Sequence, residues 1–200
     1  MMKVIEACKA IQDVRDNAVI VSTMGSLIAF DRLELQQPKL GSVPLMGGAA
    51  CLGLGLALGH PQRKVIVVDG DSSLLLQLGG LATVAGQRPR NFYHFVINNR
   101  TQFAGFSNVT VPGAGHVDFA AMAAAAGYAS TLKIENVQTL TELLPRILQS
   151  EGPVFVELSV EPDAPSLSKD TPQKEWSQVR FTRMGDEARA LQRILEVVNE

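Results

Sequence analysis

Runs of β-branched and aromatic residues alternate along the chain with longer segments whose apolar positions recur every three or four residues. The first pattern is typical of strands, and the second is typical of helices that face a core. The predicted strands are 18–22, 64–69, 92–97, 129–134 and 153–160, and the predicted helices are 2–13, 47–58, 74–86, 119–126, 137–149 and 187–198. Strands that alternate with helices predict an α/β fold with a doubly wound, mostly parallel sheet flanked by helices.

The segments between these elements are loops and turns of several kinds. We expect loops at 23–26 and 41–48, a helical turn at 31–37 before Pro38, and a long loop of small residues at 100–115. Asp118 is expected to cap the helix that follows it, and Gly127 is expected to end that helix. Residues 161–180 are rich in Pro, Ser and charge and predict an extended excursion. We therefore expect one domain over residues 1–200, in which 161–200 form an extended tail that ends in a helix.

The stretch 40–59 carries no charged side chain, which makes it a candidate for a membrane span. Pro44 and six glycines interrupt it, and its helical part at 47–58 is too short to cross about 30 Å of hydrocarbon. We interpret the stretch as a buried helix lined with small residues, and we expect no contact with a membrane.

Composition narrows the class of protein. Hydrophobic residues make up 46% of the chain and charged residues 19%, which is typical of a globular fold with a sizeable core. The formal net charge is −2 and the lysines and arginines are scattered, so we expect no nucleic acid partner. The N-terminal residues lack the charged start and apolar centre of a signal peptide, which favours a cytoplasmic location. Cys8 and Cys51 lie in apolar stretches and are expected to be buried thiols.

Polar side chains follow two of the predicted strands at the point where each strand ends. Gly70, Asp71, Ser72 and Ser73 come directly after the strand at 64–69, and the sequence Asn-Asn-Arg-Thr at 98–101 follows the strand at 92–97. Two parallel strands joined by a crossover helix end at the same edge of the sheet, where ligands of α/β proteins usually bind. We therefore expect Asp71 and Asn99 to be neighbours in space although 28 positions separate them.

These residues offer the ligands of a divalent cation. A carboxylate, an amide oxygen and a backbone carbonyl are the oxygen donors that Mg²⁺ takes, and phosphates or water complete its octahedron. The hydroxyls of Ser72 and Ser73 and the N–H groups of the following helix turn suit an anion. The pattern predicts a metal–diphosphate site. The alternative is that Asp71 or Ser72 only caps a helix while Asn98 and Asn99 only form a turn.

The spacing Gly-Asp-x-Ser…Asn-Asn resembles the signature of thiamin-diphosphate enzymes, normally Gly-Asp-Gly…Asn-Asn. In that family the Asp, the second Asn and the carbonyl two residues later hold Mg²⁺, which implies that Asp71, Asn99 and Thr101 are the metal ligands here. The similarity covers about residues 15–160 and is greatest to the diphosphate-binding subunit or domain of sulfopyruvate and phosphonopyruvate decarboxylases. One departure from the signature is Ser72, which stands where the motif has its third residue, a glycine. A residue with a Cβ is strained at this position if its φ is positive.

The same resemblance implies further cofactor contacts. It assigns diphosphate contacts to Gly70, Ser72 and Ser73 and to the loop that holds Thr23 and Ser26, whose hydroxyls are otherwise typical of a turn. At the loop before the apolar helix, Met46 matches the residue that props the cofactor into its bent shape, and Pro44 supplies a carbonyl to the aminopyrimidine. A plain core role for Met46 is the alternative.

The resemblance implies a thiamin-diphosphate-dependent lyase that decarboxylates a 2-oxo acid with Mg²⁺. In such enzymes a second domain supplies a Glu to the aminopyrimidine ring, and nothing in this sequence resembles that domain. We therefore expect a pyrimidine-binding partner subunit that provides the activating Glu, a self-dimer, or both. The alternatives are carboligation of the acetolactate synthase type, oxidative decarboxylation, and a domain that binds the cofactor without turnover. His60, His94 and His116 are not expected to be catalytic.

Overall fold

A computed structural model describes residues 2–42, 46–165 and 177–196, with the backbone alone at 177–181. The fold is built on a seven-stranded sheet in which every pair of neighbouring strands is parallel. The strand order is β1 (Met2–Lys3), β9 (Val154–Glu161), β5 (Phe92–Asn98), β4 (Val65–Gly70), β2 (Val19–Ser22) and β3 (Lys39–Gly41), and β8 (Ser130–Ile134) also pairs with β9. The predicted α/β class and parallel sheet are confirmed.

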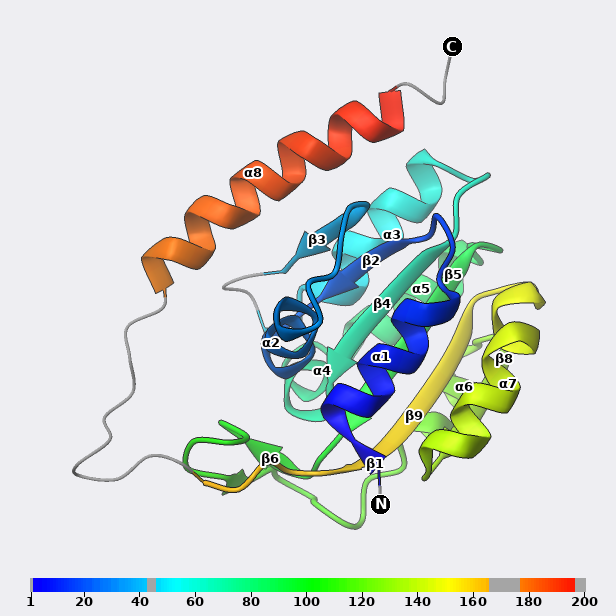
Figure 1. Ribbon diagram of the computed structural model, residues 1–200. Coiled ribbons are helices and arrows are strands. Elements are labelled where there is room, and N and C mark those ends of the chain that lie inside the picture. The colour runs from blue at the N-terminus through cyan, green and yellow to red at the C-terminus, as the bar shows by residue number, and fades with distance from the viewer. Residues whose placement is uncertain (1, 43–45, 166–176, 197–200) are drawn as a thin grey trace.

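Helices cover both faces of this sheet (Figure 1). One layer consists of α1 (Val4–Val14), α2 (Met24–Arg32) and α7 (Val137–Gln149), and the other of α3 (Ala49–Gly59), α5 (Gly79–Gln87) and α6 (Phe119–Ala126). Alternate residues of β4 point to the two faces: Ile66 and Val68 pack with the first layer, and Val65 and Val67 pack with the second. The sheet therefore has a hydrophobic core on each side.

Two further helices complete the fold. The short α4 (Asp71–Leu76) follows β4 directly, and the long α8 (Ser177–Glu196) runs beside the edge strand β3. Leu191 and Leu195 of α8 are buried in the second core. The Glu187 carboxylate accepts the N–H of Gly41 at 2.9 Å, so α8 covers the edge of the sheet and satisfies one of its backbone donors.

Several predicted boundaries are wrong. The helix predicted at 74–86 is two helices, α4 and α5, separated at Gln77 and Leu78, where the glycines that follow disfavour a continuous helix. The segment 23–26 is not a loop, because α2 begins at Met24, and this helix ends at Arg32, inside the helical turn predicted at 31–37. The last helix begins ten residues earlier than predicted, at Ser177.

Other local predictions are confirmed. The helices over 119–126 and 137–149 have the predicted bounds, and the Asp118 side chain accepts the N–H of Ala121 at 2.7 Å as a cap. Gly127 ends α6 with φ of 105°, a left-handed conformation that glycine adopts without strain. Across the described residues no helix is at once long and apolar enough to cross a bilayer.

Candidate functional site

The two polar turns meet at the carboxyl ends of β4 and β5. The Oδ2 atom of Asp71 accepts the backbone N–H of Arg100 at 2.6 Å, a contact between residues 29 positions apart. The parallel register that pairs Gly70 with Ile97 makes this contact possible, because it brings both strand ends to one edge. Asp71 and the Asn98–Thr101 turn are therefore side by side, as the order of elements predicts.

The Asp71 carboxylate is buried and carries a perturbed pKa. Burial raises the pKa of this carboxyl to about 6, while the N–H groups of Ser72, Arg100 and Asn99 oppose that rise. The negative charge of Asp69 raises it further. A divalent cation at this position would relieve both the burial penalty and the repulsion between the two carboxylates. The donor set at this edge, a carboxylate beside an amide and backbone carbonyls, fits Mg²⁺.

Asn99 and Thr101 lie in the turn that faces Asp71. The Oδ1 atom of Asn99 accepts the N–H of Thr101 at 2.9 Å and its hydroxyl at 3.1 Å. The side chain of Asn99 thus forms the turn foreseen as the alternative to metal binding, and a cation would have to share its oxygen.

The residues after β4 are buried in the first turn of α4. Ser72 has no positive φ, so replacement of the motif glycine costs no backbone strain. Within the part of the chain that the structure describes, its buried hydroxyl has no hydrogen-bond partner, which suits a residue that faces a ligand. Ser73 accepts the N–H of Gly47 at 2.8 Å, and Gly70 donates its N–H to Asp69.

Thr23 and Ser26 lie at the end of β2, next to this edge, but their hydroxyls are engaged inside the protein. Thr23 donates to the carbonyl of Ser42 at 3.1 Å. The hydroxyl of Ser26 lies 2.6 Å from the carbonyl oxygen of Val68 and 2.8 Å from that of Thr23. In this structure both hydroxyls tie β2 to its neighbours, and their contact with a diphosphate stays a prediction.

The loop before α3 rests on α4. Gly47 adopts φ of +85°, and a Cβ there would lie 2.9 Å from the Cβ of Gln77, so only glycine fits this approach. Met46 precedes it and is half-buried, which is compatible with a contact to a bound cofactor. Pro44 lies outside the described residues.

A small hollow opens beside Asp71. Asn98, Arg100 and Phe119 line it together with residues 111–115 and Val117. Within the predicted loop at 100–115, the short strands β6 (Thr101–Gln102) and β7 (Val109–Thr110) pair in an antiparallel hairpin. The chain that follows the Asn98–Thr101 turn therefore forms a hairpin, and the segment after this hairpin lines the hollow beside Asp71.

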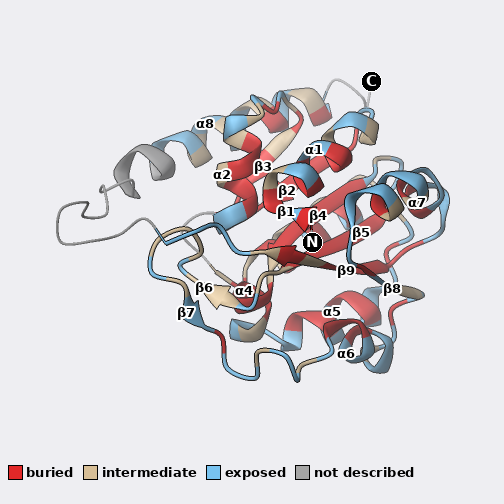
Figure 2. Ribbon diagram, turned by 60° about the horizontal axis from the view of Figure 1, so that its bottom comes forward, coloured by how far each residue is buried: buried red, intermediate tan, exposed pale blue. Residues whose placement is uncertain are grey.

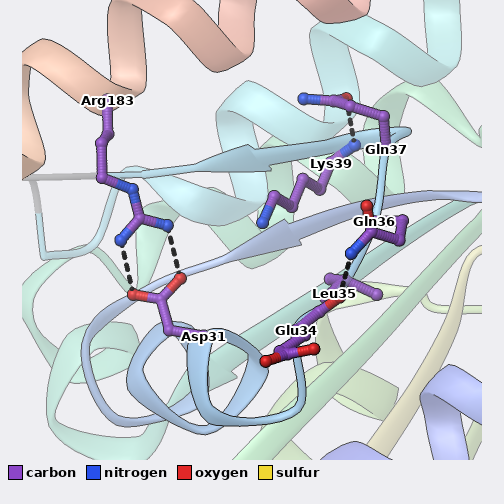
Figure 3. Close-up of a pocket in the computed structure, with 7 residues that line it drawn as sticks. All are labelled: Asp31, Glu34, Leu35, Gln36, Gln37, Lys39 and Arg183. Atoms are coloured by element: carbon purple, nitrogen blue, oxygen red, sulfur yellow. Dashed lines mark hydrogen bonds and ion pairs between the residues drawn. The ribbon is translucent and has the colours of Figure 1, made fainter.

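A larger groove lies elsewhere, between α8 and the connection from α2 to β3 (Figure 3). Arg183 of α8 donates to both carboxylate oxygens of Asp31, at 2.6 and 3.0 Å. Lys39, which also lines the groove, begins β3. The groove is thus at the amino ends of the strands, away from Asp71.

Two buried polar groups near the site were missed from the sequence. Nε2 of His94 lies 3.6 Å from Oδ2 of Asp69, and Nδ1 lies 3.1 Å from the hydroxyl of Tyr128. Burial raises the pKa of Tyr128, which keeps its hydroxyl protonated and able to donate to His94. The second missed group is Glu157 on β9, which contacts Asn98. The sequence marks both only as polar residues within apolar strand runs, which does not distinguish a buried polar group from an outward-facing one.

Comparison with known proteins agrees with this geometry. A family model described as the C-terminal TPP binding domain of thiamine pyrophosphate enzymes matches residues 24–158. The chain is 38% identical to phosphonopyruvate decarboxylase of Streptomyces viridochromogenes over 74% of its own length and 36% of that protein. It is 34% identical to the beta subunit of sulfopyruvate decarboxylase of Methanothermobacter thermautotrophicus over 85% of its own length and 90% of that subunit.

A solved structure shares the fold. Benzoylformate decarboxylase from Polynucleobacter necessarius superposes with a TM-score of 0.64 at 22% identity, over 82% of this chain and 33% of that one. The chain therefore spans about a third of the phosphonopyruvate and benzoylformate decarboxylases but most of the sulfopyruvate decarboxylase beta subunit. From the matched residues, the chain belongs to the thiamine pyrophosphate enzyme family, of which it carries the C-terminal TPP-binding domain.

Proposed function

We propose that this chain is the Mg²⁺- and diphosphate-binding part of a thiamin-diphosphate-dependent decarboxylase that acts on a 2-oxo acid, of the sulfopyruvate and phosphonopyruvate type. The observation that carries the proposal is the contact of Asp71 with the N–H of Arg100. It joins the acidic turn to the Asn-Asn turn at the edge of the sheet where ligands of α/β folds bind. The names of the two related decarboxylases support the substrate class.

In this proposal the Asp71 carboxylate, the Asn99 amide oxygen and the Thr101 carbonyl hold Mg²⁺. Gly70, Ser72 and Ser73 contact the diphosphate, with the loop of Thr23 and Ser26 beside them. Bound thiamin diphosphate supplies the electron sink that the loss of CO₂ requires. The buried hydroxyl of Ser72, which has no hydrogen-bond partner among the described residues, is available to the diphosphate. Met46 and Pro44 would orient the rest of the cofactor.

The site also requires a second polypeptide in this proposal, because a Glu is needed at the aminopyrimidine ring. The helices α3, α5 and α6 carry no Asp, Glu, Lys or Arg, and their outer faces expose apolar residues such as Leu58 and Met122. The first of these helices, α3, begins at Ala49, directly after the loop that contains Met46. Exposed apolar residues on an uncharged face are typical of a protein interface. We propose that the pyrimidine-binding partner subunit docks there, and the "subunit beta" in the name of the archaeal relative supports it.

The test is turnover with and without that partner. Purified chain, thiamin diphosphate and Mg²⁺ are incubated with sulfopyruvate or phosphonopyruvate, and CO₂ release is measured. We expect no turnover from the chain alone, turnover after addition of the partner subunit, and none when Asp71→Ala replaces the wild type. High activity of the lone chain would contradict the partner requirement, and full activity of Asp71→Ala would contradict the metal site.

Product analysis separates decarboxylation from the other chemistries of the family. With pyruvate as substrate, an aldehyde product indicates simple decarboxylation and acetolactate indicates carboligation. Turnover that depends on an added electron acceptor indicates oxidative decarboxylation.

A further inference from the structure

Glu157 is a buried carboxylate behind the candidate site. It lies on β9 with only 4% of its surface exposed. Its Oε1 accepts the side-chain N–H of Asn98 at 2.7 Å, and its Oε2 accepts the backbone N–H of Ala120 at 3.1 Å. Nζ of Lys133 lies 4.0 Å from Oε2. A buried carboxylate is unfavourable unless it is paired and hydrogen-bonded, so these contacts explain how it is retained but not what it is for.

The two donors belong to two segments that frame the site. Asn98 is the last residue of β5 and directly precedes Asn99, while Ala120 lies in the first turn of α6. Asn98 and the neighbour of Ala120, Phe119, both line the hollow beside Asp71. Glu157 therefore connects the strand that delivers the Asn-Asn turn to the helix on the other side of the hollow.

The chemistry of the contact requires a carboxylate. A carboxylate accepts hydrogen bonds on both oxygens, whereas an amide in its place offers one acceptor and one donor group. Because only the amino end of the Asn98 amide can donate to Glu157, the contact also fixes which way that amide points. The contact with Glu157 thus anchors the side chain of the residue that directly precedes Asn99.

We infer that Glu157 is a positioning residue of the Mg²⁺–diphosphate site, acting through Asn98 on the turn that holds Asn99. The inference rests on the proposed function, since it assigns a supporting residue to the same site. Residues that hold metal ligands in place, without touching the metal, change its affinity by about 10- to 100-fold when replaced. Glu157 has the burial and the contacts of such a residue.

The test compares Glu157→Gln with Asp118→Asn in the full chain, by calorimetric titration of thiamin diphosphate in the presence of Mg²⁺. Asp118 is the matched control, because it accepts a hydrogen bond from the same helix turn, at Ala121, and pairs with Lys133 at 2.6 Å, yet does not contact Asn98. We expect Glu157→Gln to weaken cofactor binding about tenfold and Asp118→Asn to change it by less than about twofold. Both titrations are run well below the melting temperature of each variant.

The measured melting temperature separates positioning from plain stability. If Glu157→Gln lowers the melting temperature but binds the cofactor like the wild type, the carboxylate is only structural and the inference is overturned. Should Glu157→Gln fail to fold, Asn98→Ala breaks the same contact while Glu157 keeps Ala120 and Lys133. A tenfold loss in Asn98→Ala supports the inference, and wild-type affinity overturns it.

Asp71→Ala, measured in parallel, keeps the two proposals apart. If Asp71→Ala loses Mg²⁺-dependent binding and the Glu157 and Asn98 variants do not, only the positioning role fails. If Asp71→Ala binds like the wild type, the metal site itself is wrong and the role of Glu157 fails with it.

Discussion

The two helix layers pack against the sheet in the same way but differ in the charge of their outer faces. Both bury apolar side chains against the strands, and both expose their outer residues (Figure 2). In the layer of α1, α2 and α7, the outer surface carries charged residues, namely Glu6, Lys9, Asp13, Asp31, Arg32, Glu142 and Arg146. In the layer of α3, α5 and α6, no residue is charged.

Packing against the sheet does not explain this difference in charge, because it requires apolar residues only on the inner face of each helix. The difference therefore reflects what surrounds the outer face of each layer. A solvent-exposed outer face is normally charged, as the first layer is. The second layer combines glycine and alanine with exposed Leu58 and Met122. Absence of charge is typical of the centre of a protein interface. This contrast supports the proposal that the layer of α3, α5 and α6 is the docking face for a partner subunit, while the layer of α1, α2 and α7 faces water.

The largest change in partner affinity is expected from a charge placed on the layer of α3, α5 and α6, called here the uncharged layer. Ala82 is exposed on α5, and Ala82→Glu should leave the chain folded but put an unpaired carboxylate into the interface. We expect about a 1000-fold loss of affinity for the partner subunit, equivalent to about 4 kcal/mol. Sedimentation of the mixed subunits measures the loss.

The control for this substitution is Thr141→Glu, which places the same side chain on exposed α7 of the charged layer. It should bind the partner like the wild type. Circular dichroism checks that both variants are folded. Equal binding by the two variants would remove the distinction between the layers.

A second effect concerns the edge where the uncharged layer meets the site. Burial and the negative charge of Asp69 raise the pKa of Asp71, the backbone N–H groups of Ser72, Arg100 and Asn99 lower it, and no cationic side chain of the described residues contributes. Its folded-state pKa of about 6 lies above the value near 3.9 of an unfolded Asp. Between these two pH values the folded state therefore binds the proton of Asp71 more tightly than the unfolded state. This proton binding stabilises the folded state fully below pH 4, and the stabilisation is lost as pH rises through 6.

The shift corresponds to about 3 kcal/mol between these limits. Urea unfolding of the metal-free chain from pH 4 to 7 should show it as a difference between the wild type and Asp71→Asn, which cannot titrate. Other groups titrate in both proteins and cancel in that difference. Parallel pH dependence of the two proteins would show that Asp71 is not perturbed.

Sequence reasoning found the parts of this molecule that depend on local order. The caps at Asp118 and Gly127 are local, and the alternation of strands and helices was enough to bring Asp71 to the Asn98–Thr101 turn. The start of α2 was missed although Thr23 is its N-cap and forms a capping box with Ser26, because hydroxyl residues beside a glycine are also typical of a turn. The length of α8 was missed because its first turns lack a continuous apolar stripe.

Glu157 could not have been found in this way. Its position in an apolar strand run is that of any outward-facing polar residue, and its partners Asn98 and Ala120 are distant in the sequence. The contact of Glu157 with Asn98 and Ala120 depends on the pairing of β5 with β9 and on the residue at which α6 begins. These are properties of the assembled fold, and no pattern in one segment reports them.

Gly53 and Gly55 of α3, two positions apart, lie on the inner and the outer face of the layer of α3, α5 and α6. A Cβ at Gly53 would lie 2.3 Å from Cγ2 of Val67 on the sheet, so Gly53→Ala overpacks the core. We expect a loss of about 2 kcal/mol in the free energy of unfolding, measured with urea. Unchanged stability would mean that α3 is not packed against β4 as described.

Gly55 faces outward, and a Cβ added there would meet no atom of the described chain within 4 Å. Alanine forms helices better than glycine, so Gly55→Ala should stabilise the isolated chain by about 1 kcal/mol. In the complex the same methyl group would stand in a closely packed interface and should weaken partner binding about fivefold, the equivalent of about 1 kcal/mol. A substitution that stabilises the chain but lowers its affinity for the partner is expected only where the partner packs directly against the glycine. If Gly55→Ala binds the partner like the wild type, α3 lies outside the interface, and its lack of charge needs another explanation.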